Sequence, residues 1–144
     1  MQKLTKYIPT IQPEKWYVVD VTNVRLGKLA TNIAQLLLGK NDPKTVDYVV
    51  NKTKVVIINA DKLSYYPSKG KTKLYTRYSG FPGGLSTTNL EDMMQKDSRK
   101  VVLNAISGML PKTKLRDKYL TNLFVYKDEK YIQTAQQPES FKIN

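Results

Sequence analysis

The chain has 144 residues, 40% of them hydrophobic, which is enough for one packed domain, and it contains neither cysteine nor histidine. These absences exclude disulfides, thiol nucleophiles and Cys-based zinc sites, and they remove the most common general base and metal ligand. With 24 Lys and Arg against 12 Asp and Glu, the formal net charge is +12, which favours a nucleic acid over an anionic membrane or no polyanion as the partner.

The first predicted element is a strand followed directly by a helix. Residues 1–15 carry two prolines and no hydrophobic period, so they are expected to form an extended arm. Residues 16–19, WYVV, predict a buried strand, and the apolar positions of residues 26–37 share one helical face. Asn23 is expected to cap the start of this helix, and Gly39 to end it in a left-handed conformation.

A second strand, residues 55–60 (VVIINA), is apolar on both faces and predicts the parallel partner that completes a βαβ unit. Residues 46–50 are expected to form a short extended piece before it. The next segment, residues 65–85, contains four cations, five aromatic residues and no acid. Within it, residues 73–78 alternate as in a third strand, and residues 79–84 (SGFPGG) predict a loop.

Two helices are expected after this loop. Thr88 and Glu91 have the spacing of a capping box for a short helix over residues 89–95. The second helix begins at Ser98 and ends at Pro111. Its predicted apolar face consists of Val101, Val102, Ala105, Ile106, Met109 and Leu110.

A fourth strand is predicted at residues 123–126 (LFVY), and residues 127–144 are expected to be a polar tail that is too poor in apolar residues to build core. Strands and helices alternate along the chain, which indicates an α/β fold in a single domain spanning residues 1–144.

Several motifs, in this order, resemble the ribosomal protein L13 family of the large subunit, in its bacterial and organellar form. They are WYVVD and LGKLA in residues 16–30, GK at 39–40, NA at 59–60, SG and GG at 79–84, GMLPK at 108–112, and AQ with Pro138 near the end. The chain departs from the family pattern at several positions; Tyr78, for instance, stands where the family usually has histidine.

The resemblance implies a three-layer α/β/α domain with a four-stranded, mostly parallel sheet. It also implies a structural role: binding large-subunit ribosomal RNA beside neighbouring ribosomal proteins, and supporting early assembly and translation. The setting would be a bacterial cytoplasm, a mitochondrial matrix or a plastid stroma. No catalytic residue, metal, cofactor, small-molecule substrate or membrane is expected, and no apolar run approaches the ~20 residues of a membrane helix.

The predicted RNA-binding residues combine cations for phosphates, tyrosines for unpaired bases and glycines for close backbone approach. They are Lys28, Lys40, Lys69, Lys71, Lys73, Tyr75, Arg77, Tyr78, Gly83, Gly84, Lys112, Lys114, Arg116 and Lys118. We predict that residues 69–77 and 112–118 together form one RNA surface, because each segment is basic and poor in apolar residues.

These residues also have structural explanations. The segment 65–85 is alternatively a solvated hairpin, and residues 112–118 an ordinary solvated helix face, since Asp117 lies among the cations. Lys40 also suits the negative end of the preceding helix dipole. For Met109, packing is the preferred interpretation, and for Asp20 it is a local turn or cap acceptor.

A small α/β enzyme acting on a phosphorylated or nucleotide substrate is the main alternative function. Such an enzyme places its glycines between the first strand and the first helix. Residues 20–25 contain no glycine, and Gly27 lies inside the predicted helix, which favours RNA binding. A free nucleic-acid chaperone is a third possibility, separable by competition between ribosomal and unrelated RNA.

Overall fold

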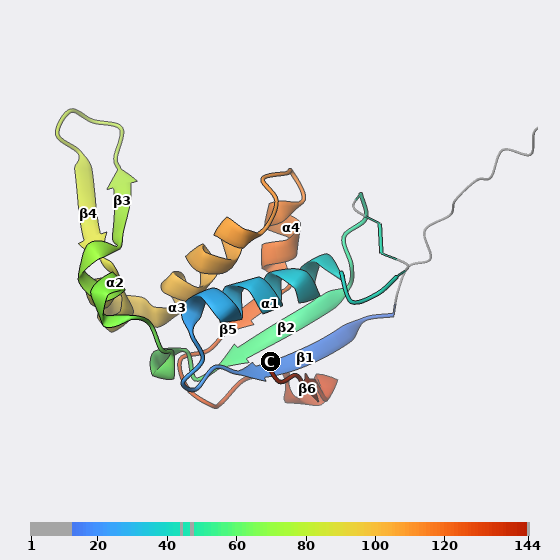
Figure 1. Cartoon of the computed structure of the whole chain (residues 1–144). Helices are drawn as coiled ribbons and strands as arrows, with labels where there is room; N and C mark the ends of the chain where they lie inside the picture. Colours follow the sequence, from blue (N-terminus) through green and yellow to red (C-terminus); the bar gives the residue numbers. More distant parts are fainter. Residues whose placement is uncertain (1–12, 44, 47, 144) are drawn as a thin grey trace, which may run out of the picture.

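A computed structural model describes residues 13–43, 45, 46 and 48–143 (Figure 1). Its main sheet has four strands in the order β5–β2–β1–β6, and all three pairings are parallel. The predicted α/β class and four-stranded sheet are confirmed. The strands are β1 (Lys15–Asp20), β2 (Thr53–Ile58), β5 (Leu123–Val125) and β6 (Glu139–Ser140). Most of the predicted arm, residues 1–12, lies outside the described residues.

The predicted βαβ unit is confirmed. Helix α1 (Leu26–Leu38) connects β1 to β2, which pair in parallel with Val18 opposite Val56. The helix ends at Gly39 with φ 71°, where an added Cβ would collide with Asn51. The prediction that Asn23 caps α1 was wrong, because Asn23 itself has a positive φ and the cap position falls two residues later, at Arg25.

The second connection, from β2 to β5, is long and leaves the sheet. It contains the 3₁₀ turn η1 (Ala60–Lys62), α2 (Pro67–Thr72), β3 (Leu74–Tyr78), β4 (Leu85–Asn89), α3 (Leu90–Met109) and α4 (Arg116–Thr121). Strands β3 and β4 form a separate antiparallel hairpin, which projects away from the main sheet (Figure 1). The strand predicted at residues 73–78 therefore exists but belongs to this hairpin. The predicted strand at 55–60 ends at Ile58, since Ala60 begins η1.

The two helices predicted after the loop form one helix, α3, with a kink. Asp97 has φ −159° and ψ 95° inside α3, so the helix changes direction just before Ser98, as the sequence indicated. The predicted capping box was wrong: Thr88 belongs to β4, and Asn89 occupies the cap position without a side-chain hydrogen bond. The helix ends at Met109, two residues before Pro111.

The C-terminal segment contributes more than the sequence suggested. Strand β6 pairs with β1, and the Phe141 ring meets Tyr17 edge to face at 6.0 Å between ring centroids. No residue of the described part of this segment, 127–143, belongs to the buried core, but Phe141 and Ile143 are partly buried and pack against it. Residues 46–50, in contrast, form no strand in their described part.

The helices lie on one face of the sheet. Val19 and Ile57 belong to one buried core cluster with residues of α1 and α3, the helices that lie over this face of the sheet (Figure 1). On the opposite face Val56 is also fully buried, and Trp16 stacks on Phe124 at 5.7 Å. The chain after β5, including the 3₁₀ turn η2 (Gln133–Gln136), covers this second face (Figure 1). The sheet thus lies between two layers, which confirms the predicted three-layer arrangement, with one layer thinner than the other.

Candidate nucleic-acid interface

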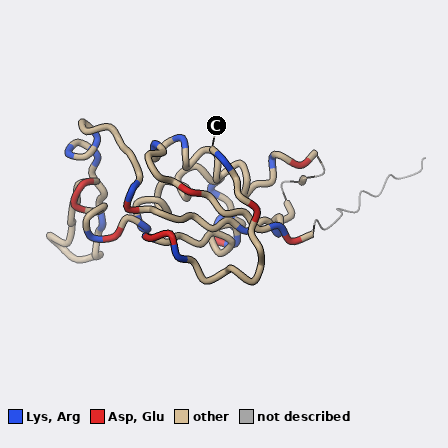
Figure 2. The backbone as a smooth tube through the Cα atoms, turned by 90° about the horizontal axis from the view of Figure 1, so that it is seen from below, with Lys and Arg blue, Asp and Glu red and all other residues tan. Residues whose placement is uncertain are grey.

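Most cations of the described chain have no acidic partner. The ion pairs among the described residues are Lys15–Asp42, Lys54–Glu14 and Arg99–Asp97. None of them uses a predicted RNA-binding residue, so the positive charge of those residues is left uncompensated within the described chain. Figure 2 shows Lys and Arg at both ends of the molecule rather than on one element.

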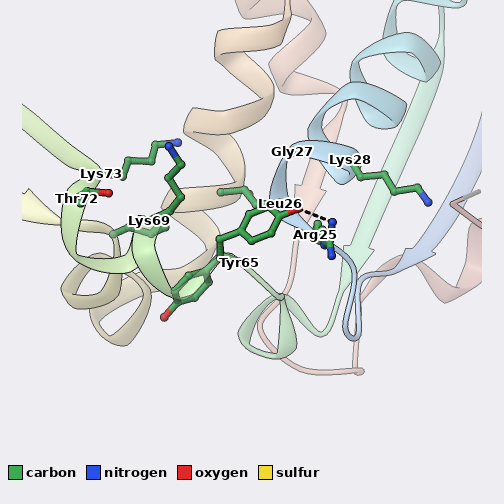
Figure 3. A pocket seen from close by; sticks show the side chains of 10 residues that line it. Arg25, Leu26, Gly27, Lys28, Tyr65, Lys69, Thr72 and Lys73 are labelled. Atoms are coloured by element: carbon green, nitrogen blue, oxygen red, sulfur yellow. Dashed lines mark hydrogen bonds between the residues drawn. The ribbon is translucent and has the colours of Figure 1, made fainter.

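A basic groove with a volume of about 740 Å³ lies between the first turn of α1 and helix α2 (Figure 3). Among the residues that the structure describes, its lining contains four cations and no acid: Arg25 and Lys28 on the α1 side, Lys69 and Lys73 on the α2 side. Residues 25–28 and 69–73 are far apart in sequence, and the isolated bridge between Arg25 and Ser64 holds the two segments together. This groove therefore joins Lys28 to two of the predicted cations.

Arg25 is held in place by an aromatic ring. Its guanidinium carbon lies 4.7 Å from the centroid of the Tyr66 ring, and Nη1 donates a hydrogen bond to the Tyr66 hydroxyl at 2.5 Å. A cation over a tyrosine face is electrostatically favourable, and the guanidinium keeps further N–H groups for a ligand. Lys28 points away from Lys69 and Lys73 (Figure 3), so the cations surround the groove instead of clustering at one point.

The β3–β4 hairpin has two different faces. Arg77 and the half-buried Tyr75 line a second groove, of about 580 Å³, against α3. Burial raises the pKa of Tyr75, and its hydroxyl is buried, so this predicted stacking residue packs inward. The other face carries Leu74, Tyr78 and Leu85, all more than half exposed.

The glycine loop at the hairpin tip has its own structural requirements. Gly83 has φ 73°, which L side chains rarely adopt, although the space around it is open. A Cβ at Gly84 would lie 2.0 Å from the Ser79 hydroxyl, and the two residues share a backbone hydrogen bond of 3.1 Å. The turn itself thus explains both glycines, whether or not RNA approaches it.

The cations between α3 and α4 do not form one group. Lys112 and Lys114 are exposed in the turn that precedes α4, which rises from the helical side of the sheet, as the hairpin does (Figure 1). Arg116 is half-buried, and its Nε donates to the Pro111 carbonyl oxygen at 3.4 Å, so it braces the turn. Lys118 instead lines a separate depression with Lys52 and Lys54.

The predicted residues are therefore brought together only in part. Lys28, Lys69 and Lys73 line one groove. Lys71 is exposed on α2, the helix that also carries Lys69. Lys40 follows the C-terminal end of α1, about 20 Å from the groove by the rise of the helix.

Three cations that sequence reasoning missed complete these surfaces. Arg25 belongs to the first groove, and Lys96 and Lys100 face the hairpin across the second. Lys96 and Lys100 lie on either side of the kink at Asp97, so helical spacing in the sequence did not group them. Arg25 occupies the N-cap position of α1, and only the tertiary contact with Tyr66 reveals its neighbours.

The carboxyl end of β1 carries the one acid considered as functional, Asp20. Burial by itself would raise its pKa, but hydrogen bonds from the Thr22 hydroxyl and backbone N–H, and from Asn59, lower it instead. Asp20 thus ties the ends of β1 and β2 together, which confirms the predicted turn acceptor. Among the described residues, no group of His, Cys, Asp and Glu has a metal-binding arrangement. No helix of that part of the chain combines the length and apolarity needed to cross a membrane.

Comparison with known proteins decides the family. The family described as "Ribosomal protein L13" matches residues 14–131, which include the groove, the hairpin and α4. The chain belongs to this family. L13 proteins are structural ribosomal proteins and not enzymes.

Individual relatives extend this L13 match over almost the entire chain. The chain is similar to large ribosomal subunit protein uL13 of Acaryochloris marina, 40% identical over 95% of this chain and 92% of the relative. The uL13 protein of Spiroplasma citri is 41% identical over 96% and 94%, and that of Desulfitobacterium hafniense 43% identical over 90% of each.

Proposed function

We propose that this L13-family chain is a structural constituent of the large ribosomal subunit that binds large-subunit ribosomal RNA and supports early subunit assembly. The observation that carries the proposal is the set of cations left without acidic partners on a rigid α/β frame, together with the family match. The relatives are large ribosomal subunit proteins, which supports the subunit, and the positive charge supports RNA as the partner.

The geometry suggests how binding would work. Cations on α1, α2, the hairpin and the turn before α4 would neutralise phosphates at several separated points, which fixes the orientation of a protein on folded RNA. Since the packed core fixes the backbone from which these elements extend, little backbone needs ordering when the RNA binds.

Neighbouring ribosomal proteins are proposed as further partners through the outer face of the hairpin. Tyr78 and Leu85 form a cross-strand pair, each 63% exposed, and Phe81 at the tip is 74% exposed. An apolar strip on a projecting element is more typical of a contact surface than of a free surface.

Sucrose-gradient sedimentation of an extract tests the proposal. We expect the protein to co-migrate with the large subunit, and confinement to the soluble fractions would contradict the proposal.

The salt dependence of RNA binding is a second test. The affinity of the purified protein for large-subunit ribosomal RNA should fall strongly as the salt concentration rises. If about six phosphates are neutralised, log K should fall with log salt at a slope of roughly −4 to −5. A slope near zero, or equal binding of unrelated RNA, would argue against a defined electrostatic RNA site.

A further inference from the structure

Two adjacent tyrosines beside the α1–α2 groove have different surroundings. Tyr65 packs against the hydrophobic core and the backbone of Gly70, so its ring has a structural role. Tyr66 contributes nothing to that core and is 55% exposed. Arg25 lies over the Tyr66 ring and donates a hydrogen bond to its hydroxyl, so the ring is held in one orientation while more than half of the residue stays exposed.

The chemistry around Tyr66 fits one kind of ligand. Flat aromatic groups stack on a tyrosine face, and the four surrounding cations require negative charge on either side of that group. None of the described lining residues carries a negative charge that would repel an anion. A nucleotide with its flanking phosphates has this combination, whereas a protein side chain does not.

We propose that the groove is a subsite for a single unstacked nucleotide of RNA, whose base stacks on Tyr66 while the flanking phosphates contact Arg25, Lys69 and Lys73. The inference rests on the proposed function and locates one RNA contact in the α1–α2 groove. In this arrangement the Arg25–Tyr66 contact is a preformed platform, so the ring loses little freedom when the base arrives.

Gly27 offers a way to block the groove without harming the fold. It lines the groove in the first turn of α1, and an added Cβ would meet no atom within 4 Å. Gly27→Glu introduces a carboxylate among the cations, near a helix N-terminus where acids are favourable, and it replaces a poor helix former. The melting temperature should stay the same or rise, while affinity for the large-subunit ribosomal RNA transcript falls by at least about tenfold.

The matched control is Gln35→Glu, which makes the same charge change on an exposed position of the same helix, outside the groove. It should bind the transcript nearly as the wild type does. Equal losses in Gly27→Glu and Gln35→Glu would mean that net charge alone matters, and the subsite would be rejected.

Stacking is tested separately with a tetranucleotide that contains 2-aminopurine between uridines, and with its abasic counterpart. The wild type should quench the 2-aminopurine fluorescence and bind this probe about tenfold more tightly than the abasic one. Tyr66→Ala should abolish both the quenching and the preference, while Tyr66→Phe, which keeps the ring, retains them. If Tyr66→Ala quenches as the wild type does, no base stacks there and the inference fails.

Failure of the inference differs from failure of the proposed function. If the wild type binds the ribosomal transcript and both Gly27→Glu and Tyr66→Ala match the control, the groove is not a subsite but the function stands. If the wild type does not bind the transcript at all, the proposed function itself is wrong.

Discussion

The sheet with α1 and the α2–hairpin projection are built on different principles. In the sheet region, Val19, Ile33 and Ile57 are fully buried. The strand and helix periods there match the spacing of the apolar residues in the sequence. In the projection, residues 67–89, the one buried residue is Gly70, and the strands pair only with each other.

The difference shows where this chain is free to carry function. Buried apolar side chains fix the sheet region, so few of its residues can take another role. The projection has few such restraints, and its cations and the rings of Tyr78 and Phe81 remain exposed, whereas Tyr75 packs inward. One attachment of the projection to the domain is at Leu90, the first residue of α3. Its side chain is buried, and its backbone N–H donates to the Lys73 carbonyl oxygen at 3.0 Å.

The largest expected effect is on stability, and it separates the two regions. Ile33→Ala should lower the free energy of unfolding by about 2–5 kcal/mol, because it leaves a cavity in the core. Leu85→Ala, in the hairpin, should change it by less than about 1 kcal/mol, because this side chain is mostly exposed. Urea denaturation measures both, and comparable losses would show that the hairpin packs on the domain more than its exposure indicates.

The next effect is on RNA affinity, with stability unchanged. Lys71→Glu/Arg77→Glu in the projection and Lys112→Glu/Lys114→Glu in the turn before α4 should each weaken binding to large-subunit ribosomal RNA by about tenfold. If the surfaces act independently, the combined variant should lose about a hundredfold. Circular dichroism and melting should stay near wild type, since all four positions are exposed.

The control for these pairs is Lys130→Glu/Lys142→Glu, at exposed positions of the C-terminal segment. A loss as large in this variant would mean that net charge, and not the placement of the two surfaces, governs binding. A loss confined to the turn variant would remove the projection from the RNA interface.

A smaller effect is expected at the carboxyl edge of the sheet. Asp20→Asn should destabilise the protein by about 1 kcal/mol at neutral pH, because the carboxylate accepts hydrogen bonds from Thr22 and Asn59. The folded state lowers the pKa of Asp20, so its contribution is present above the ordinary aspartate pKa and is lost as pH falls through the lowered value. Melting temperatures recorded from about pH 7 to about pH 3 should therefore converge for wild type and variant. If the difference in melting temperature stayed constant over this pH range, the charge of Asp20 would not be the cause of the effect.

The smallest effect is expected at Met109. The helical spacing of the sequence predicts that it is buried, but the side chain is 52% exposed at the end of α3. Met109→Ala should accordingly cost less than about 1 kcal/mol, whereas Ile106→Ala, fully buried one turn earlier, should cost about 2–5 kcal/mol. Chemical denaturation of the pair measures both, and equal costs would mean that Met109 is buried in the folded protein.

Hydrophobic spacing alone determined the central unit of the fold. The apolar runs at residues 16–19 and 55–60 and the helical face between them predicted β1, α1 and β2 as a parallel unit, because burial on both faces leaves few alternatives. The end of α1 at Gly39 was equally predictable, since a left-handed residue is a local property of the backbone. The excess of cations over acids also indicated a polyanionic partner without any structure.

Only the tertiary structure shows which strand completes the sheet and which cations line the same groove. The alternating residues 73–78 form a hairpin outside the sheet, while the two-residue strand β6, which has no sequence signal of its own, takes the edge beside β1. Similarly, the Arg25–Tyr66 contact joins residues 41 positions apart, and no local pattern encodes such a distance. Local spacing determines what a segment buries, but pairing partners and shared grooves depend on how the whole chain packs, because those contacts form between segments that the sequence does not place together.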